Sequence, residues 1–301
     1  MTSKKSVSLV LGSGGARGMA HIGVIEVLEE RGYEIREIAG SSAGALVGGI
    51  YAAGQLPEFT EWICNLGRVD VFGLMDFSFS SKGFIRGEKV FQELRKIVQE
   101  RKIEELPIPF SCNAVDYHHG VDRVFDSGSL FSAIRASVSI PSLVQPAIID
   151  GIEYIDGGVL NPLPLNLLDR EEERMVLAVN LNALGDSYIA PPQKDHFGKR
   201  LIKTPGWFRD YQNRMKKYFD QAEKEKTKEI KSLGSLDLIN RSMELLHDRV
   251  SQLTLEKHQA DVLIEISKRQ ASTMEFYRAA EMIEIGRIKT EKALDSWENE
   301  S

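Results

Sequence analysis

The sequence predicts an α/β fold with a mostly parallel central sheet, and three observations lead to this prediction. Short apolar runs with the length of a buried strand occur at residues 7–11, 35–39 and 175–180. Segments with apolar residues at helical spacing lie between these runs, as at residues 22–28. Glycine-containing turns join the first two strands to the helices that follow them. Strands and helices that alternate in this way are typical of a sheet covered by helices.

The same patterns assign the individual elements in chain order. The first helix is expected to end near Arg31 and Gly32, because a basic residue followed by a glycine favours a helix C-terminus. A helix of small residues is expected over 43–53, ended by Gly54 and Pro57. The later elements are strands at 110–115, 121–126 and 262–266, a hairpin over 148–155 that turns at Asp150–Gly151, and helices at 90–100, 236–255 and 274–294.

Composition predicts three parts in a chain of 301 residues that is 42% hydrophobic, enough to bury a large core. We expect a core over residues 7–182, a basic and aromatic insertion or cap over 183–234, and a C-terminal helix–strand–helix extension over 235–301 that packs on the core. The formal net charge is −6, with 38 Lys and Arg against 44 Asp and Glu. This balance gives no electrostatic reason to expect nucleic acid as a partner.

Cysteine usage and the N-terminus predict a cytoplasmic protein without a metal or an organic cofactor. Cys64 and Cys112 are the only cysteines, and neither belongs to a pair or cluster with the spacing of zinc ligands. The N-terminal apolar stretch is too short for a signal peptide. Residues 38–57 are uncharged, but their five glycines favour a buried strand, turn and helix over a membrane span.

The first motif that could carry chemistry is Gly40-Ser41-Ser42-Ala43-Gly44, which matches G-x-S-x-G between a predicted strand and a predicted helix. In that setting the central serine occupies a strained turn that needs small neighbours, and its hydroxyl projects from the edge of the sheet. The following helix adds a dipole that favours negative charge at its N-terminus. We therefore predict Ser42 as a nucleophile and a packing role for Ser41.

A second motif, G-S-G-G-A-R-G, joins the first strand to the first helix. Alone it suggests a phosphate-binding loop, but it has neither the glycine spacing of a dinucleotide site nor the Gly-Lys pair of a P-loop. Glycine permits close approach, so the N–H groups of Gly14 and Gly15, with Ala16, can converge on the oxyanion of a tetrahedral intermediate. We expect Arg17 and Gly18 to support this loop.

A serine nucleophile needs a proton acceptor, and the histidines offer no clear one. They are His21, His118, His119, His196, His247 and His258. The last three lie in charged or helical segments without a glycine-rich turn, and His21 is expected to fix the glycine loop. Asp156 ends an apolar strand before two glycines, so its carboxylate could act as the base beside the serine. A turn-forming aspartate is the alternative, and we assign Asp150 to the hairpin turn.

Together these motifs resemble those of the patatin-like phospholipase family, in particular its bacterial members related to neuropathy target esterase. The matching stretches are residues 14–18, 40–44, 136–141 and 156–158, and they agree with the family in order and spacing. The resemblance covers about residues 7–182.

The resemblance implies a three-layer α/β/α sandwich, a catalytic dyad of Ser42 and Asp156 without a histidine, and an oxyanion hole in the glycine loop. It also implies hydrolysis of acyl esters in phospholipids or lysophospholipids, through an acyl-enzyme and without a cofactor. One departure is Ser13, which stands where the family often has the first of three glycines.

Residues 197–219 carry seven Lys and Arg against one Asp, interleaved with aromatic residues. This segment could lie on an anionic membrane, which would place the protein peripherally at the inner membrane surface, or it could be an ordinary solvated helix. Two other functions also remain open at this point. One is a thioesterase or transacylase that uses the same site, and the other is a regulatory or lipid-binding protein whose catalysis is weak or dispensable.

Overall fold

The computed structural model describes residues 5–75, 87–141, 143–169, 174–185 and 235–300. The chain divides into two compact units, Met1–Pro191 with Glu244–Ser301, and Pro192–Met243. The sheet, the candidate site and the covering helices belong to the first unit, except for residues 235–243 at the start of one helix, and the first unit is the part described below. Most of the predicted insertion at 183–234, including the basic and aromatic residues 197–219, lies outside the described residues.

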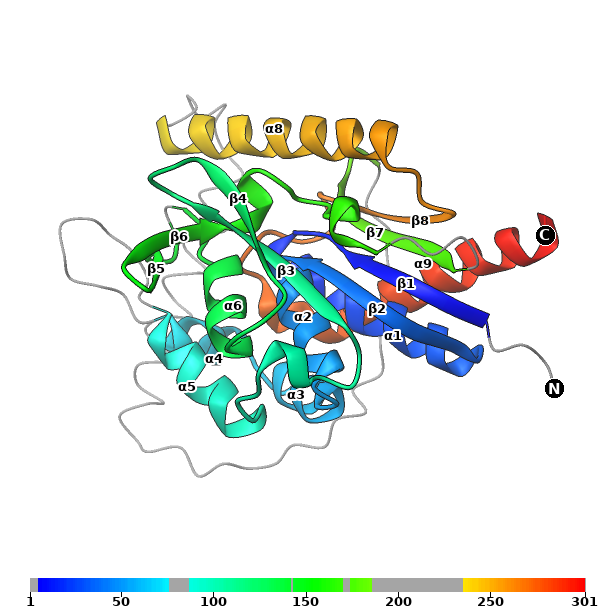
Figure 1. Ribbon diagram of the computed structural model, residues 1–301, viewed down its shortest axis with the longest axis horizontal. Coiled ribbons are helices and arrows are strands. Elements are labelled where there is room, and N and C mark those ends of the chain that lie inside the picture. Colours follow the sequence, from blue (N-terminus) through cyan, green and yellow to red (C-terminus); the bar gives the residue numbers. More distant parts are fainter. Residues whose placement is uncertain (1–4, 76–86, 142, 170–173, 186–234, 301) are drawn as a thin grey trace, which may run out of the picture. The chain divides into compact units, whose positions relative to one another are not determined.

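The centre of the first unit is a mixed sheet whose middle is parallel (Figure 1). Its described strands are β1 (Lys5–Leu11), β2 (Tyr33–Ser41), β3 (Phe110–Asp116), β4 (Val121–Phe125), β5 (Ala147–Ile149), β6 (Ile152–Asp156), β7 (Met175–Ala183) and β8 (Val262–Ser267). Their order is β5-β6-β3-β2-β1-β7-β8, and β4 pairs with β3 off this path. Strands β8, β7, β1, β2 and β3 run parallel, whereas β4, β5 and β6 form antiparallel pairs. The predicted mostly parallel α/β sheet is confirmed.

Helices cover both faces of this sheet. They are α1 (Ala20–Glu30), α2 (Ala43–Ala52), α3 (Leu56–Cys64), α4 (Arg68–Leu74), α5 (Glu88–Ile97), α6 (Leu130–Ser137), α8 (Ser235–Lys257) and α9 (Ala279–Glu300). The larger core lies on the face covered by α1, α2 and α9. On the other face Leu163 and Leu165 pack on β1, with Leu255 of α8 against the same cluster. The resulting three layers confirm the predicted sandwich.

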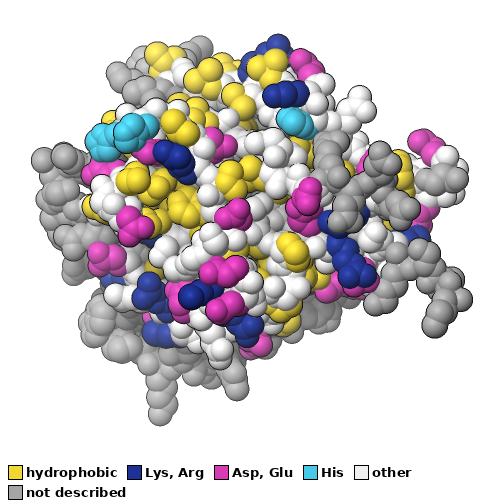
Figure 2. Space-filling model, viewed as in Figure 1, with side chains coloured by type: hydrophobic (Ala, Val, Ile, Leu, Met, Phe, Trp, Pro, Cys, Tyr) yellow, Lys and Arg dark blue, Asp and Glu magenta, His cyan; other side chains and the backbone are white. Residues whose placement is uncertain are grey.

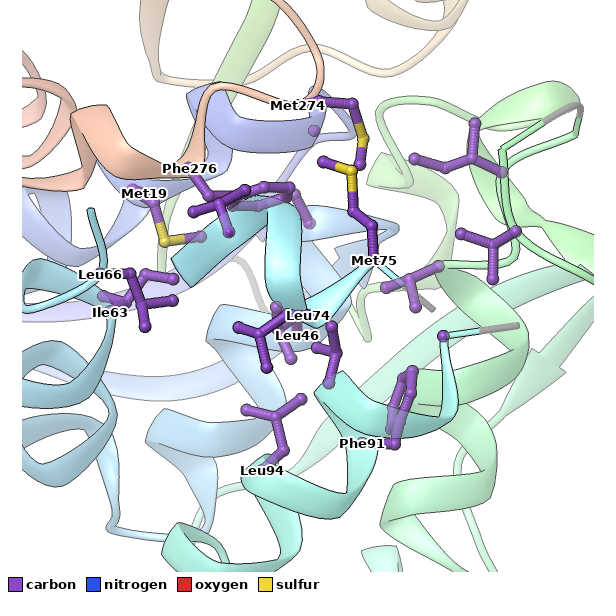
Figure 3. A pocket seen from close by; sticks show the side chains of 18 of the residues that line it. Met19, Leu46, Ile63, Leu66, Leu74, Met75, Phe91, Leu94, Met274 and Phe276 are labelled. Carbon is purple, nitrogen blue, oxygen red and sulfur yellow. The ribbon is translucent and has the colours of Figure 1, made fainter. Parts of the chain in front are cut away.

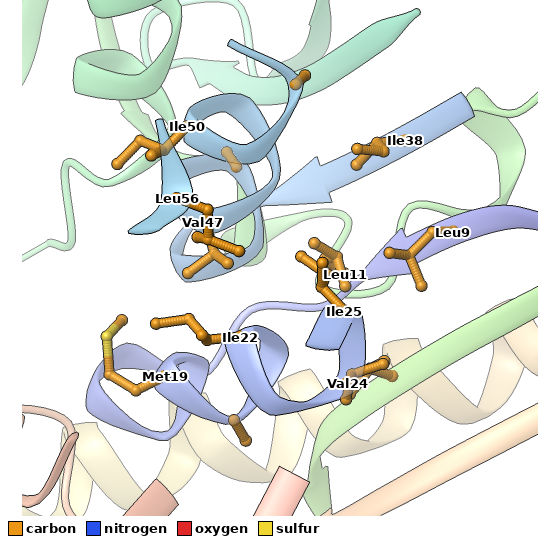
Figure 4. Packing of buried hydrophobic residues seen from close by; sticks show 14 of the residues in the cluster. Leu9, Leu11, Met19, Ile22, Val24, Ile25, Ile38, Val47, Ile50 and Leu56 are labelled. Atoms are coloured by element: carbon orange, nitrogen blue, oxygen red, sulfur yellow. The ribbon is translucent and has the colours of Figure 1, made fainter. Parts of the chain in front are cut away.

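Alternation along β1 explains why both faces are apolar. Leu9 and Leu11 belong to the larger core, whereas Val10 belongs to the smaller one. Figure 4 shows the β1 leucines beside Ile22 and Ile25, which α1 contributes at helical spacing. Burying one such side chain stabilises the fold by roughly 1.5–3 kcal/mol, so this interface is a main source of stability.

The C-terminal extension does more than pack on the core, because β8 adds an edge strand to the sheet beside β7. Its last helix, α9, approaches α1 closely through glycines. A Cβ atom on Gly23 would lie 2.0 Å from the Ile283 carbonyl oxygen, and one on Gly286 would lie 2.1 Å from the Ala20 carbonyl oxygen. Glycine at both positions therefore lets the two backbones meet. The predicted final helix begins later than expected, at Ala279.

Helix α8 turns part of its apolar side outward. Leu245, Leu246 and Leu253 are exposed, whereas Asp248 and Ser251 are buried. Figure 2 shows apolar side chains scattered among charged ones over the visible face of the molecule. Within the part of the chain that the structure describes, no helix is long and apolar enough to cross a membrane.

Candidate active site

Ser42 occupies the sharp turn between β2 and α2. Its φ of 53° and ψ of −116° fall in a region that costs a non-glycine residue about 1–3 kcal/mol. Among the described residues, Asp150 is the only other non-glycine residue with a positive φ. The flanking glycines are needed for space, because a Cβ on Gly44 would lie 1.9 Å from the Leu11 carbonyl oxygen. A Cβ on Gly40 would likewise lie 2.6 Å from the carbonyl oxygen of Gly44, so the turn cannot form with larger residues.

The structure brings Ser42 and Asp156 together. Ser42 Oγ donates a hydrogen bond of 2.5 Å to Asp156 Oδ2, and the Gly158 N–H donates one of 2.7 Å to Asp156 Oδ1. Both side chains are buried. Burial raises the pKa of Asp156 to about 7, and the hydrogen bonds from Ser42 and Gly158 partly oppose that rise. Near neutral pH such a carboxylate can accept a proton as well as release one.

The described histidines lie away from this pair. The His21 ring donates from Nε2 to the Gly12 carbonyl at 2.9 Å, so it braces the start of the glycine loop. Burial lowers the pKa of His21 to about 4, which leaves the ring neutral at pH 7. His118 and His119 bind the carboxylates of Glu153 and Asp116. In the part of the chain that is described, no histidine forms a hydrogen bond with Ser42 or Asp156.

The glycine loop presents two N–H groups that have no acceptor among the described residues, those of Gly14 and Gly15. The Ala16 N–H is already used, because it donates to the Thr273 carbonyl at 2.9 Å. Ala16 therefore drops out of the predicted oxyanion donors. Gly15 has a φ of 58°, a conformation that favours glycine. Ser13, the departure from the family pattern, donates its N–H to Pro162.

Arg17 binds residues outside this loop, and Gly18 lies close to the serine turn. The buried Arg17 donates from Nη1 to the carbonyls of Lys268 and Ala271 at 3.1 and 2.9 Å, and from Nη2 to Asn182 Oδ1 at 3.1 Å. Its guanidinium is thus bound to backbone and amide oxygens. A Cβ on Gly18 would lie 2.3 Å from the Ala43 Cβ, so glycine allows the loop to approach the serine turn.

Two further residues position the Ser–Asp pair, and the motif analysis assigned them no role. Ser137 Oγ accepts the Ser42 N–H at 2.9 Å, and the Ser139 carbonyl accepts the Asp156 N–H at 2.9 Å. Ser139 is fixed in turn, because its hydroxyl exchanges hydrogen bonds with Arg135. One short segment therefore sets the backbone positions of both Ser42 and Asp156. The available signal was the 136–141 stretch of the family resemblance.

An apolar cavity of about 150 Å³ opens beside Ser42 (Figure 3). Side chains from α2, α3, α4 and α5 form about half of its wall, and Gly15 and Ser42 lie along it. The apolar wall residues include Met19, Leu46, Phe59, Trp62, Ile63, Leu66, Leu74, Met75, Phe91, Leu94, Met274 and Phe276. A cavity of this character suits a hydrocarbon chain attached to the serine. No cluster of His, Cys, Asp or Glu fit for a metal ion occurs among the described side chains.

Sequence comparisons find one family, that of the patatin-like phospholipases and NTE proteins. The profile described as patatin-like phospholipase matches residues 9–169. An NTE family protein of Mycobacterium tuberculosis (strain ATCC 25618 / H37Rv) is 34% identical over 336 residues, covering 99% of this chain and 93% of that protein. Lysophospholipase NTE1 of Kluyveromyces lactis is 32% identical over 192 residues, covering 61% of this chain and 13% of that protein. VipD from Legionella pneumophila aligns in structure with a TM-score of 0.47 and 16% identity, covering 97% of this chain and 67% of that one.

Proposed function

This chain belongs to the patatin-like phospholipase family, and from that premise we propose that it is a serine hydrolase that cleaves carboxylic esters of phospholipids or lysophospholipids. The observation that carries the proposal is the hydrogen bond from Ser42 Oγ to Asp156 Oδ2 beside an apolar cavity. The bond supplies a nucleophile with an adjacent base, and the cavity supplies room for an acyl chain.

In the first step Asp156 accepts the proton of the Ser42 hydroxyl while Ser42 Oγ attacks the ester carbonyl carbon. The carbonyl oxygen becomes an oxyanion, which the N–H groups of Gly14 and Gly15 stabilise. One such donor is typically worth about 3–4 kcal/mol of transition-state stabilisation. Because the two glycine N–H groups have no acceptor among the described residues, they can form these bonds without first breaking others.

The tetrahedral intermediate then collapses to an acyl-enzyme. The bond to the alcohol oxygen breaks, and Asp156 returns its proton to that oxygen, so the alcohol leaves neutral. In the second half of the reaction a water molecule gives a proton to Asp156, and the oxygen of that water attacks the acyl carbon. When this second intermediate collapses, the bond from the acyl carbon to Ser42 Oγ breaks and Asp156 returns its proton to Ser42 Oγ, which releases the fatty acid and restores the Ser42 hydroxyl.

Lipid is the proposed substrate class because the wall beside Ser42 is apolar over nearly its whole extent. The printed name of the Kluyveromyces lactis relative, a lysophospholipase, supports the same class. Membrane contact through residues 197–219 and a cytoplasmic location stay predictions, as does the absence of a cofactor.

The direct test compares wild type, Ser42→Ala and Asp156→Asn on p-nitrophenyl butyrate and on a lysophospholipid. We expect Ser42→Ala to lose activity by about 10⁴-fold or more, because the nucleophile is removed while the fold is kept. Circular dichroism of each variant checks the fold. A fluorophosphonate probe should label Ser42 in wild type only. Full activity in Ser42→Ala would refute the proposal, and labelling without ester hydrolysis would favour transfer to another acceptor.

A further inference from the structure

Two side chains of the apolar cavity come from outside the part of the chain that the family profile matches. Met274 and Phe276 follow β8, whereas the other described residues of the wall lie between Gly15 and Val144. Figure 3 shows both on the same segment, with Met274 at the end of the cavity near Met75. Both line the cavity and are only partly buried, so each keeps accessible apolar surface.

Glu275, the residue between them, holds this segment in one conformation. Its Oε2 accepts the Ser272 N–H at 2.9 Å, and its Oε1 accepts the Tyr277 hydroxyl at 2.8 Å. Ser272 and Tyr277, which flank the stretch that contains Met274 and Phe276, therefore both bind the Glu275 carboxylate. Met274 and Phe276 are presented to the cavity from a fixed backbone, as a specificity wall requires.

The same segment also touches the reacting end of the cavity. Thr273 accepts the Ala16 N–H through its carbonyl, and a Cβ on Gly15 would lie 2.6 Å from Thr273 Cγ2. Met274 follows Thr273 directly, so it lines the cavity beside the loop that would hold the oxyanion. An acyl chain that leaves the Ser42 ester and enters the cavity must therefore pass this wall.

We propose that Met274 and Phe276 are specificity-determining residues that select long acyl chains over short ones; this inference rests on the proposed acyl hydrolase function. Their thioether and aromatic surfaces would contact methylene groups of the chain, and burial of each methylene favours binding. A short acyl group would cover only the part of this surface nearest the serine, whereas a longer chain would cover more of it. Long chains therefore gain more from the wall than short ones.

The test is the ratio of kcat/KM for p-nitrophenyl decanoate to kcat/KM for p-nitrophenyl butyrate. Both esters are cleaved by the same active sites, so the ratio does not change when a fraction of the protein fails to fold. We expect Met274→Ala and Phe276→Ala each to lower the ratio about tenfold, the lower end of the effect of one methylene contact in an apolar pocket. Phe276→Leu, which disturbs packing less, should lower it by a smaller factor.

Met282→Ala is the matched control. Met282 is fully buried in α9 but does not line the cavity, so its truncation should lower stability and leave the ratio unchanged. If the ratio also stays at the wild-type value in Met274→Ala, Phe276→Ala and Phe276→Leu, this inference is overturned while the proposed function stands. If wild type neither reacts with the fluorophosphonate probe nor cleaves either ester, the proposed function fails first and the inference with it.

Discussion

The region that carries the motifs and the segment that follows β8 contribute to the same site in different ways. The first supplies the groups proposed to react, Ser42 and Asp156, and the N–H groups of Gly14 and Gly15, which have no acceptor among the described residues. The second, residues 268–276, supplies no reacting group. It holds the loop through carbonyls and adds two side chains to the cavity.

This difference shows why one region is recognisable in the sequence and the other is not. A nucleophile or a base must be a particular residue type, whereas a backbone carbonyl that accepts a hydrogen bond is offered by every residue. The contacts that the C-terminal segment makes through its carbonyls therefore do not restrict which residue types occur there. The predictions below test whether each region acts as assigned.

The largest effect is expected where a proposed reacting group is changed. Asp156→Asn cannot accept the serine proton, so kcat should fall by about 10³-fold, within the range of general-base catalysis. In wild type, kcat/KM should rise with pH through about 7 and then level off, because burial raises the pKa of Asp156 to about 7 and only the ionised form accepts a proton. A profile that is flat between about pH 5 and 9 would contradict the assignment of Asp156 as base.

The same pKa predicts a stability change of defined sign. In the folded protein Asp156 keeps its proton up to a pKa of about 7, whereas in the unfolded chain it loses the proton near the usual aspartate pKa of 3.8. The folded state therefore binds more protons between these values, and the free energy of unfolding contributed by Asp156 falls as pH rises through that window. Urea unfolding at about pH 5 and about pH 8 measures this change. Between these two pH values the free energy of unfolding of wild type should fall relative to that of Asp156→Asn.

Arg17→Met tests the tether between the two regions. Loss of the bonds to Lys268, Ala271 and Asn182 should let the glycine loop shift, and a displacement near 1 Å can cost roughly 100-fold in kcat. KM for the short ester should change much less. Arg17→Lys keeps a donor and should recover part of the rate. Wild-type kcat and an unchanged rate of fluorophosphonate labelling in Arg17→Met would show that the C-terminal tether does not position the loop.

Ser137→Ala should have a smaller effect. It leaves the buried Ser42 N–H without its acceptor, which should lower the free energy of unfolding by about 1–3 kcal/mol. The labelling rate of Ser42 should fall as well, because the serine backbone is less firmly held. Ser296→Ala removes an exposed serine of α9 and serves as the matched control, with both quantities expected at wild-type values. Equal behaviour of the two variants would argue against a positioning role for Ser137.

The smallest effect is expected for Asp150, the other aspartate followed by glycine. It lies in the turn between β5 and β6 with a φ of 50°, so Asp150→Gly removes backbone strain at an entropic cost. The free energy of unfolding should change by less than about 1 kcal/mol. Ester hydrolysis should remain at the wild-type rate. A loss of activity comparable to that of Asp156→Asn would mean that the assignment of the two aspartates is wrong.

Local sequence patterns were sufficient for much of the fold. The strands around the glycine loop and the serine turn, the small-residue helix α2 and the hairpin turn at Asp150–Gly151 lie where their patterns predicted. Comparison with known proteins confirms the family resemblance. Short helices such as α4 and α6 were not predicted, because seven or eight residues hold too few turns for a clear period.

By itself the sequence determined the fold class, the family and the candidates Ser42, Asp156 and the glycine loop, because strained turns and acyl-transfer chemistry restrict which residue types can serve. The tertiary structure decided how these groups are held. It showed that the Thr273 carbonyl accepts the Ala16 N–H and that Met274 and Phe276 line the cavity. It also showed that Ser137 accepts the Ser42 N–H and that Ser139 accepts the Asp156 N–H. Most of these contacts join residues far apart in the chain, such as Ser42 and Ser137, which are 95 positions apart, and no local pattern encodes them.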